Sequence, residues 1–345
     1  MEALMELTPV RHINRETAKV NFPVQAVEDV EIIDVIDSLQ THSKQFIEAN
    51  TTAVTLKHLQ NDCIVPVFRD NELTVSHVNF IETVFDAASR IFPRERIDKP
   101  EVRVSHVIRG RTPEAIHKPV SELLEKDKTI YYERMAFVME IPTIQETING
   151  NPLHLSIGGV RAYNHENLYS KKTSEKFKVF IGFNNKVCCN LCISTDGYKE
   201  EIKAMSCYEL QQCIMELFQM YNIRKHLYLM NNFKNYFLTE HQFAQLIGKS
   251  KLYQCLLPKE RKQLPRFEMN DSHINIIARN YYRDEAFSRD SNHTVNLWNV
   301  YNLFTGAVKN SYIDNFLNKS VNATDFTHGI ASALNGDTAY QWFLS

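Results

Sequence analysis

The feature that most constrains the fold is the stretch TIYYERMAFVMEI, from Thr129 to Ile141, which Pro142 follows directly. Its side chains alternate as on a β-strand, and proline is typical of a strand end. Large residues stand on both faces of this strand, with Tyr132, Ala136 and Val138 on one and Tyr131, Met135, Phe137, Met139 and Ile141 on the other. A strand that is apolar on both faces is covered on both faces. We therefore expect 129–141 to be a central strand of an antiparallel or mixed sheet.

Other segments before residue 204 show a mixture of strand and helix patterns. The predicted elements are strands over 64–68, 102–108 and 153–163, a turn at 70–71, a helix from the cap Ser76 to about Ile91, a bulge at Gly158-Gly159 and a hairpin at 184–186.

Helical periodicity replaces this mixture after residue 204. Capping boxes at 206–209 and 239–242 each open a predicted helix, and the second helix is expected to end at Gly248. Further helices are predicted near 272–283, 294–305, 311–318, 322–334 and 338–344. The fold class is therefore α+β, an antiparallel or mixed sheet with flanking helices followed by a helical C-terminal half.

The chain of 345 residues is long enough for two domains or one large one. We predict a loose arm over 1–26, a mixed α+β domain over 27–204 and a helical region over 205–345, which forms its own domain or packs on the same core. Apolar residues make up 43% of the chain and charged residues 23%, as in an ordinary globular protein with a substantial core.

The opening MEALMELTPV lacks the basic segment and apolar run of a signal peptide. No stretch approaches the ~18 apolar residues of a membrane span. The seven cysteines are odd in number, which argues against a disulfide scaffold. We expect a cytoplasmic protein with no membrane partner.

Cys189 and Cys192 form a C-x-x-C pair, with Cys207 and Cys213 downstream. Four thiolates are able to hold zinc, but VCCNLCIS has strand character, and a strand points Cys189 and Cys192 to opposite faces. We interpret these cysteines as small buried hydrophobic residues, and expect no metal site and no cofactor.

Two segments resemble catalytic motifs but do not match them fully. A phosphate-binding loop ending in Gly248-Lys249-Ser250 needs a glycine where Phe243 stands. Asp196 with Glu201-Ile202-Lys203 resembles the carboxylates and lysine of a metal-dependent nuclease, but we expect Glu201 to lead into a helix and to be solvated. The sequence therefore offers no catalytic residue, and we do not expect an enzyme.

Charge is distributed unevenly although the net charge is only −2. Residues 28–48 hold six acidic residues and one lysine, 171–186 five lysines and one acid, and 224–266 nine basic residues and two acids. Aromatic residues are interleaved with basic ones near Tyr228 and in Tyr281-Tyr282-Arg283. This mixture suits single-stranded nucleic acid, on which aromatic rings stack and cations meet phosphates. Solvated charged faces above core aromatics are the alternative.

Arg109 and Arg111 flank Gly110 where the chain leaves the 102–108 strand. We predict a flexible loop there that presents two guanidinium groups to phosphates. Arg103 and Lys118 lie near its ends, and Arg161 is expected on a neighbouring strand. These five residues are the candidate nucleic-acid contacts.

The segment NLWNVYNLFTG carries an asparagine at every third position, Asn296, Asn299 and Asn302, and we expect its helix to end at Gly306. The three amides form a stripe that drifts by about 60° a step on an otherwise apolar helix. In one interpretation they are a buried polar seam that bonds backbone or the edge of the sheet. In the other they face a groove and bind bases or sugars.

Three segments, GVRAYNHENLYSKK, FKVFIGFNNKVCCNLCISTDG and VNLWNVYNLFTGAVKNSYIDNF, resemble a bacterial family known only as a domain of unknown function. That family is similar in turn to phage/plasmid-like proteins, through the landmarks Cys189-Asn190, 159–161 and 302–305. The resemblance implies residence on a mobile genetic element and supplies no catalytic residue.

We therefore expect a non-enzymatic accessory protein of a plasmid, prophage or conjugative element that binds single-stranded or structured DNA. The alternative is an element-encoded interaction factor that binds a host or element protein through residues 28–48 or an aromatic face. A metal-dependent nuclease is third. The oligomeric state is left open.

Overall fold

A computed structural model describes residues 45–64, 74–115, 117–165 and 174–345, which belong to one compact unit, 44–345. Several predicted features lie outside the described residues: the arm over 1–26, the turn at 70–71, all of the 64–68 strand except Ile64, and the acidic segment up to residue 44.

The centre of this unit is an antiparallel sheet in the order β1-β2-β3-β4-β5-β6, in which β7 also pairs with β5. Its strands are β1 (Thr52–Val54), β2 (Glu101–Arg111), β3 (Lys128–Ile148), β4 (Asn151–Ala162), β5 (Glu175–Asn185), β6 (Asn190–Cys192) and β7 (Tyr198–Ala204). The predicted α+β class, with an antiparallel sheet and flanking helices, is confirmed.

Strand β3 is central, as predicted, because it pairs with β2 on one side and β4 on the other. It does not end at Pro142. The ladder with β4 shifts register between Ile141 and Gln145, and this irregularity accommodates the proline, which has no N–H to donate.

The predicted bulge at Gly158-Gly159 is wrong, because both residues stay in register with β3 and β5. The glycines instead allow neighbouring side chains and backbone to lie close to strand β4. A Cβ on Gly159 would meet the Phe80 ring at 2.6 Å and the Lys178 carbonyl oxygen at 2.5 Å. Glycine is therefore needed for α3 to press its aromatic ring onto the sheet.

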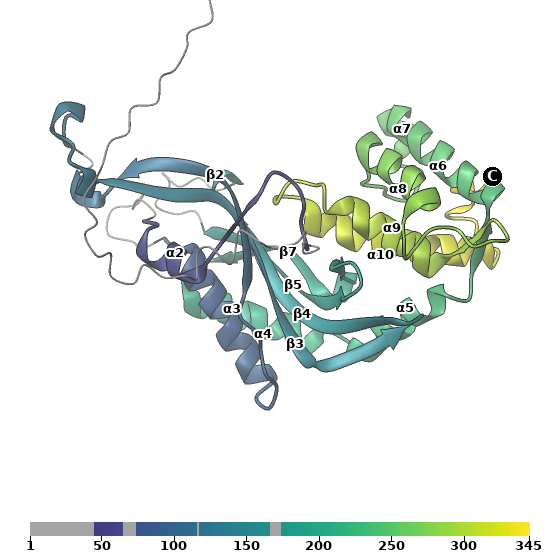
Figure 1. Ribbon diagram of the computed structural model, residues 1–345, viewed down its shortest axis with the longest axis horizontal. Helices are drawn as coiled ribbons and strands as arrows, with labels where there is room; N and C mark the ends of the chain where they lie inside the picture. Colours follow the sequence, from purple (N-terminus) through teal and green to yellow (C-terminus); the bar gives the residue numbers. More distant parts are fainter. Residues whose placement is uncertain (1–44, 65–73, 116, 166–173) are drawn as a thin grey trace, which may run out of the picture. The chain divides into compact units, whose positions relative to one another are not determined.

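Helices α3 (His77–Ile91) and α4 (Cys207–Met220) pack against each other and against the sheet, while α2 (Leu56–Asn61) adjoins α3 (Figure 1). Helix α3 begins at the predicted cap Ser76, whose hydroxyl accepts from the Asn79 N–H at 3.0 Å. Helix α4 begins at its predicted cap as well, where the Ser206 hydroxyl accepts from the Glu209 N–H.

The C-terminal half is helical, as predicted, and adds a two-stranded sheet that the sequence did not indicate. Its elements are α5 (Ile223–Phe233), β8 (Phe237–Thr239), α6 (Glu240–Cys255), α7 (Pro258–Arg261), α8 (Asp271–Arg283), β9 (Thr294–Asn296), α9 (Leu297–Val308) and α10 (Phe316–Leu334). Short 3₁₀ helices span Pro113–Ala115, Val120–Glu122, Glu125–Asp127, Tyr163–His165, Thr195–Gly197 and Gln341–Phe343. Within the described ranges, no helix has both the length and the apolar character that crossing a membrane requires.

Two predicted helix ends are wrong. Helix α6 continues through Gly248, and α9 continues through Gly306. A glycine inside a helix costs about 1 kcal/mol relative to alanine, which buried side chains beyond it, such as Tyr253 in α6, offset. The predicted helices 311–318 and 322–334 are replaced by one helix, α10, which begins only at Phe316.

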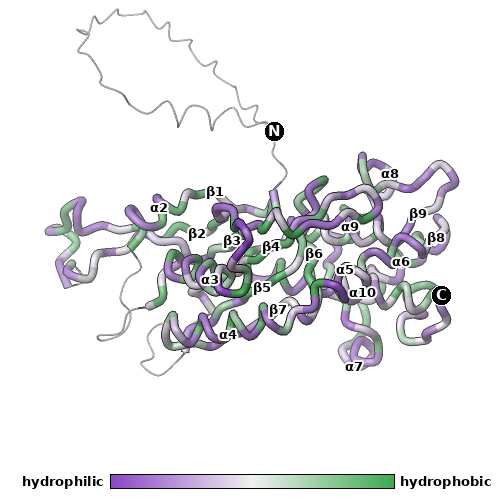
Figure 2. The backbone as a smooth tube through the Cα atoms, turned by 90° about the horizontal axis from the view of Figure 1, so that it is seen from below, coloured by the Kyte–Doolittle hydropathy of each residue, from purple (hydrophilic) through white to green (hydrophobic). Residues whose placement is uncertain are grey.

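The buried apolar side chains form one continuous cluster that extends from the sheet, for example Phe137 and Phe183, into the helical half, for example Trp298. Hydrophobic residues accordingly run along the strands as well as through α9 (Figure 2). The predicted parts 27–204 and 205–345 thus share one core among the residues described.

Three histidines are buried in this core as neutral side chains. Burial, followed by the nearby Arg161, lowers the pKa of His77 to about 3. Burial lowers the pKa of His226 to about 4, and burial with Lys319 lowers that of His273 to about 4. His273 accepts the Asn270 N–H at Nδ1, so its Nε2–H is the donor toward Ser311.

We expect the free energy of unfolding to fall as the pH is lowered from 6.5 toward 4, because these histidines protonate only after unfolding. The unfolded state then binds more protons than the folded state, so acid favours unfolding. Urea denaturation across this range measures the dependence. The variant His226→Phe should show a shallower dependence, and a stability that is flat over this range would contradict the assignment.

Candidate nucleic-acid interface

The predicted flexible arginine loop is a strand. Arg109 and Arg111 lie in β2, and Gly110 between them pairs with Thr129 of β3. Arg109 is exposed, whereas Arg111 donates to the Lys118 carbonyl oxygen at 2.6 Å. The Lys118 ammonium group in turn forms an ion pair with Asp127 at 2.9 Å. The alternation of 102–108 continues past its predicted end because β3 offers partners as far as Lys128.

Arg103 and Arg161 are buried, so neither presents its guanidinium group at the surface. Arg103 donates to the Thr51 hydroxyl at 3.1 Å and to the Thr51 carbonyl at 2.9 Å. The guanidinium group of Arg161 is fully buried and has structural partners, which excludes the predicted contact with nucleic acid in this structure. Its guanidinium forms an ion pair with Glu175, donates to the Val75 carbonyl, and stands over the rings of Tyr163 and Phe177 at 4.6 and 4.5 Å.

The asparagine stripe separates into three different roles. Asn296 is the N-cap of α9 and accepts the Asn299 N–H at 2.9 Å. Asn299 is half-buried and donates only a long hydrogen bond, 3.4 Å, to the Ser288 carbonyl. Asn302 is 1% exposed and belongs to the core.

Asn302 fits the interpretation of a buried polar seam. Its Nδ2 donates to the Trp298 carbonyl, and its Oδ1 accepts from the Asn185 amide, both at 2.9 Å. The Asn190 amide donates to the Asn302 carbonyl at 2.9 Å. The seam therefore joins α9 to the β5–β6 hairpin. Sequence reasoning missed Asn185 and Asn190, although both are polar residues within apolar strands.

The cysteine pair is not on one strand. Cys189 lies in the turn before β6 with a left-handed φ of 57°, and Cys192 is buried in β6. The predicted alternation of the two side chains along a strand is thus wrong for Cys189, because the hairpin turn occupies 186–189 rather than 184–186. In the described part of the chain, no three His, Cys, Asp or Glu residues are grouped so as to hold a metal ion.

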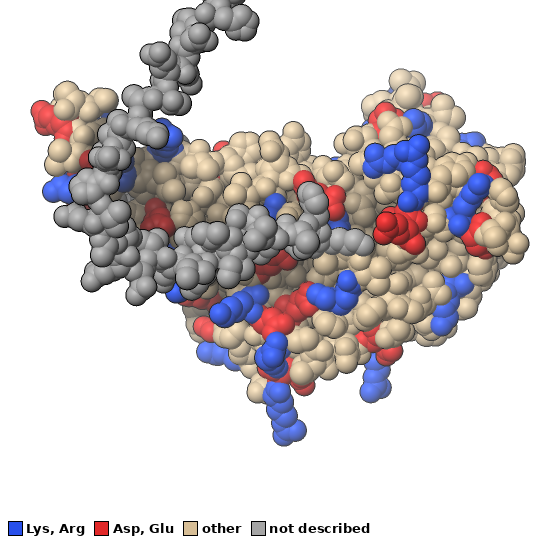
Figure 3. All heavy atoms as spheres, viewed as in Figure 1, with Lys and Arg blue, Asp and Glu red and all other residues tan. Residues whose placement is uncertain are grey.

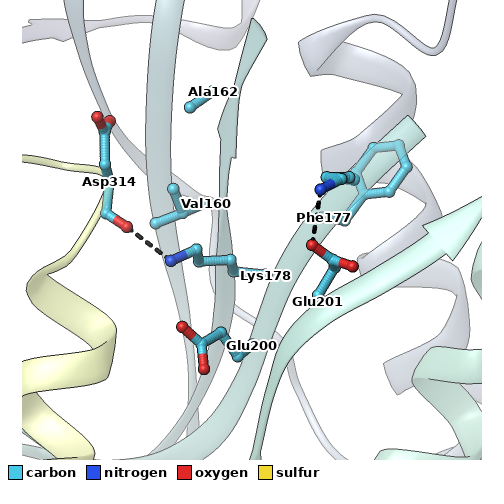
Figure 4. Close-up of a pocket in the computed structure, with 8 residues that line it drawn as sticks. Val160, Ala162, Phe177, Lys178, Glu200, Glu201 and Asp314 are labelled. Carbon is cyan, nitrogen blue, oxygen red and sulfur yellow. Dashed lines mark hydrogen bonds and ion pairs between the residues drawn. The ribbon is translucent and has the colours of Figure 1, made fainter. Parts of the chain in front are cut away.

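A cavity of about 490 Å³ lies beside β5 and β7. Figure 4 shows Lys178 extending from β5 toward Asp314, with the Glu200 carboxylate nearby. The Lys178 Nζ donates a hydrogen bond to the Asp314 carbonyl oxygen, with 2.7 Å between the two atoms. Lys178 also donates to Asn318 Oδ1 at 2.8 Å. Burial lowers the pKa of Lys178, although Glu200 and Asp314 oppose this. These contacts tie β5 to the start of α10.

The residues of the nuclease-like pattern are not brought together. Glu201 sits on strand β7, not at a helix start, and its carboxylate lies between Lys176 and Lys203 at 2.8 and 2.9 Å. The Asp196 carboxylate accepts instead from the Ser194 hydroxyl and the Asn222 N–H. The arrangement gives the nuclease hypothesis no support.

Helix α8 presents the surface best suited to nucleic acid. Its buried side is His273, Ile274, Ile277 and Tyr281. Its exposed residues are Asp271, Ser272, Asn275, Arg279, Tyr282 and Arg283, and we call the last five the α8 face. Hydroxyl, amide and guanidinium groups along one helix face are the groups that bond base edges and phosphates.

Helix α8 is held firmly on its buried side. The Tyr281 ring stacks on Phe243 of α6, with centroids 4.1 Å apart and planes inclined by 13°. At the exposed side, the Tyr282 hydroxyl donates to Glu240 at 2.7 Å, and Arg289 stands over the Tyr282 ring. The α8 face is therefore displayed on a rigid support, which favours precise recognition.

Charge around the α8 face is mixed. On the side of the molecule drawn in Figure 3, lysine and arginine are interspersed with aspartate and glutamate and form no continuous positive surface. The sequence marked only Tyr281-Tyr282-Arg283 in this helix. The helical spacing of Ser272, Asn275 and Arg279 opposite Ile274 and Ile277 is the signal that identifies the rest of the face.

The chain belongs to the family described as "Domain of unknown function, B. Theta Gene description (DUF3871)", whose model matches residues 27–344. The predicted resemblance to a family of unknown function is thus confirmed at that level. No curated protein and no solved structure matches the chain.

We expect the substitution Asn302→Leu to lower the free energy of unfolding by about 1–3 kcal/mol, because it leaves the buried Asn185 donor without its acceptor. Asn299→Leu is the matched control on the same helix and should cost less, since Asn299 makes one long hydrogen bond. Urea denaturation compares the two. Equal losses would show that the seam does not depend on Asn302.

We expect Arg161→Met to destabilise the protein by about 3–5 kcal/mol, because it leaves the Glu175 carboxylate buried without its ion pair. Arg109→Met, at an exposed position of β2, should stay within about 0.5 kcal/mol of the wild type. Adding Glu175→Gln to Arg161→Met should recover part of the loss. Thermal and urea unfolding test this ranking, which a similar loss in both single variants would refute.

Proposed function

We propose that the protein binds nucleic acid without acting on it chemically, and that the α8 face is the contact. The observation that carries the proposal is the composition of that face, two arginines with an amide and a hydroxyl, next to the exposed Asp271 at the start of the helix. Arginine binds phosphates and guanine edges, and asparagine binds adenine edges.

The position of α8 adds support. The helix rests on α6 and α9 through the buried residues Ile277 and Tyr281, which leaves the residues of the α8 face exposed. A helix supported in this way is suited to lie in a groove or along an unpaired strand. The Tyr282 side chain is exposed, and the Arg289 guanidinium over its ring adds a cation near the α8 face.

The resemblance to phage/plasmid-like proteins supports a narrower form of the proposal. In that form the protein is an accessory factor of a plasmid, prophage or conjugative element, and its target is single-stranded or structured DNA. The mixed charge of the surface fits a selective target, since a protein with few phosphate contacts gains little from non-specific attraction.

An interaction with another protein is the second candidate, and a different feature favours it. Where β2 and β3 extend toward the segment that joins them, Val107, Val120 and Leu124 are 56, 77 and 56% exposed. Large apolar side chains exposed in one part of the chain favour a surface that a partner covers.

We expect labelled single-stranded, duplex and hairpin DNA to be bound by the purified protein with or without Mg²⁺, at unequal affinities. The double variant Arg279→Ala/Arg283→Ala should weaken binding and reduce the salt dependence by about one to two units of slope. The variant Arg94→Ala/Arg109→Ala removes the same charge from exposed positions elsewhere and is the matched control.

Fluorescence anisotropy across a salt series provides the measurement. Absence of binding to all three DNAs at physiological salt would overturn the proposal in favour of the protein-interaction candidate. Loss of binding in the control variant alone would place the contact outside the α8 face.

A further inference from the structure

A second cavity, of about 360 Å³, lies between the turn before β6, helix α8 and the end of α9. Arg279 and Arg283 of the α8 face also line this cavity. The cavity is therefore open to whatever lies along α8, and its opposite wall is the polar seam, formed there by Asn190 and Asn302.

The wall of the cavity holds a buried acceptor that no described residue satisfies. Asn190 is 2% exposed, and its Oδ1 receives no hydrogen bond from the described residues. The orientation of the amide is fixed, because its Nδ2 donates to the Asn302 carbonyl at 2.9 Å and a flipped amide would set two oxygens against each other. Burying a carbonyl oxygen without a hydrogen-bond donor costs free energy, and a ligand that supplies a donor would remove that cost.

Gly306 lies beside this acceptor and lines the same cavity. A Cβ built on Gly306 would lie 3.6 Å from Asn190 Nδ2 and 3.8 Å from Oδ1, which is ordinary contact without a clash. Packing therefore does not require glycine at this position, although glycine is a poor residue for a helix interior. The glycine places no side chain against the buried Asn190 Oδ1, which is one of two buried amide oxygens, with Asn184 Oδ1, that receive no hydrogen bond from the described residues.

The charged residues around the cavity favour a ligand without net charge. Three cationic residues, Arg279, Arg283 and Lys309, face three acidic ones, which are Glu48, Asp284 and Glu285. Lys309 is already engaged with the Cys188 carbonyl. A phosphate deep in the cavity would meet carboxylates as well as cations, whereas a neutral group with N–H donors would not be repelled.

A nucleobase is such a group. Its exocyclic amino and ring N–H groups are donors, and asparagine amides pair with base edges. The amides of Asn190, Asn280, Asn302 and Asn310 border the cavity, and the two arginines at its rim are placed to hold the adjoining backbone.

We propose that this cavity receives one unpaired base of the nucleic acid bound on the α8 face, with a base N–H donating to Asn190 Oδ1. The inference rests on the proposed function. An unpaired base enters a protein cavity at lower cost than a paired one, because no base pair has to be broken. The protein would thus prefer a bulged or looped target to a continuous duplex.

The test uses three short DNA duplexes of otherwise identical sequence: fully paired, with one bulged 2-aminopurine, and with an abasic site in the bulge. The wild-type protein should bind the 2-aminopurine bulge roughly tenfold more tightly than the abasic bulge, the effect of about one hydrogen bond to a buried group. The 2-aminopurine fluorescence should change as the base leaves the stack.

The variant Gly306→Ala should abolish that preference by placing a methyl group against Asn190 Oδ1. Gly248→Ala is the matched control, a glycine inside α6 with open space around it. Both variants should raise the melting temperature, because alanine favours a helix more than glycine does. A loss of preference confined to Gly306→Ala would thus not be due to unfolding.

The outcomes separate the two proposals. If none of the three duplexes binds, the proposed function fails. If they bind equally, or if Gly306→Ala keeps the preference for the 2-aminopurine bulge, the cavity does not hold a base and only binding along α8 stands.

Discussion

Buried amide groups decide how the helical half of this protein lies on its sheet. Asn185, Asn190 and Asn302 are buried, so their amide groups depend on hydrogen-bond partners within the protein. They satisfy one another between the β5–β6 hairpin and α9, and a shift of α9 along the hairpin would break two hydrogen bonds at once. Apolar contacts tolerate small displacements, whereas paired amides fix one arrangement.

A buried ion pair fixes the position of the start of α3 on the sheet. The Arg161–Glu175 ion pair joins β4 to β5, and both residues also bond the backbone of Val75, just before α3. Gly159 beside it allows the Phe80 ring of α3 to reach the sheet. The charge of Arg161 is enclosed by the rings of Tyr163 and Phe177 and not solvated, so the ion pair holds β4, β5 and the start of α3 together.

The same seam that fixes α9 leaves one of its oxygens unused. Asn190 donates to α9, its Oδ1 accepts no hydrogen bond from the described residues, and Asn190 and the adjacent Gly306 both line a cavity. The cavity adjoins α8, whose outward face carries the two arginines of the proposed contact. The structural and binding interpretations of the asparagines are therefore compatible. The Asn190 amide holds α9 in place through its N–H group, and its carbonyl oxygen is left to accept a hydrogen bond from a ligand.

Local pattern in the sequence was sufficient for the α+β class, the central strand β3, the cap of α3 and the helical C-terminal half. These depend on side-chain alternation and on residues close in the chain, which a sequence displays directly. It was not sufficient for the ends of elements: Gly248 and Gly306 lie inside helices because buried contacts beyond them outweigh the cost of glycine. Nor did it distinguish the exposed Arg109 from the buried Arg161. Only the tertiary structure decides whether an arginine meets solvent or a carboxylate distant in the chain, because burial and partner choice depend on contacts that no local pattern encodes.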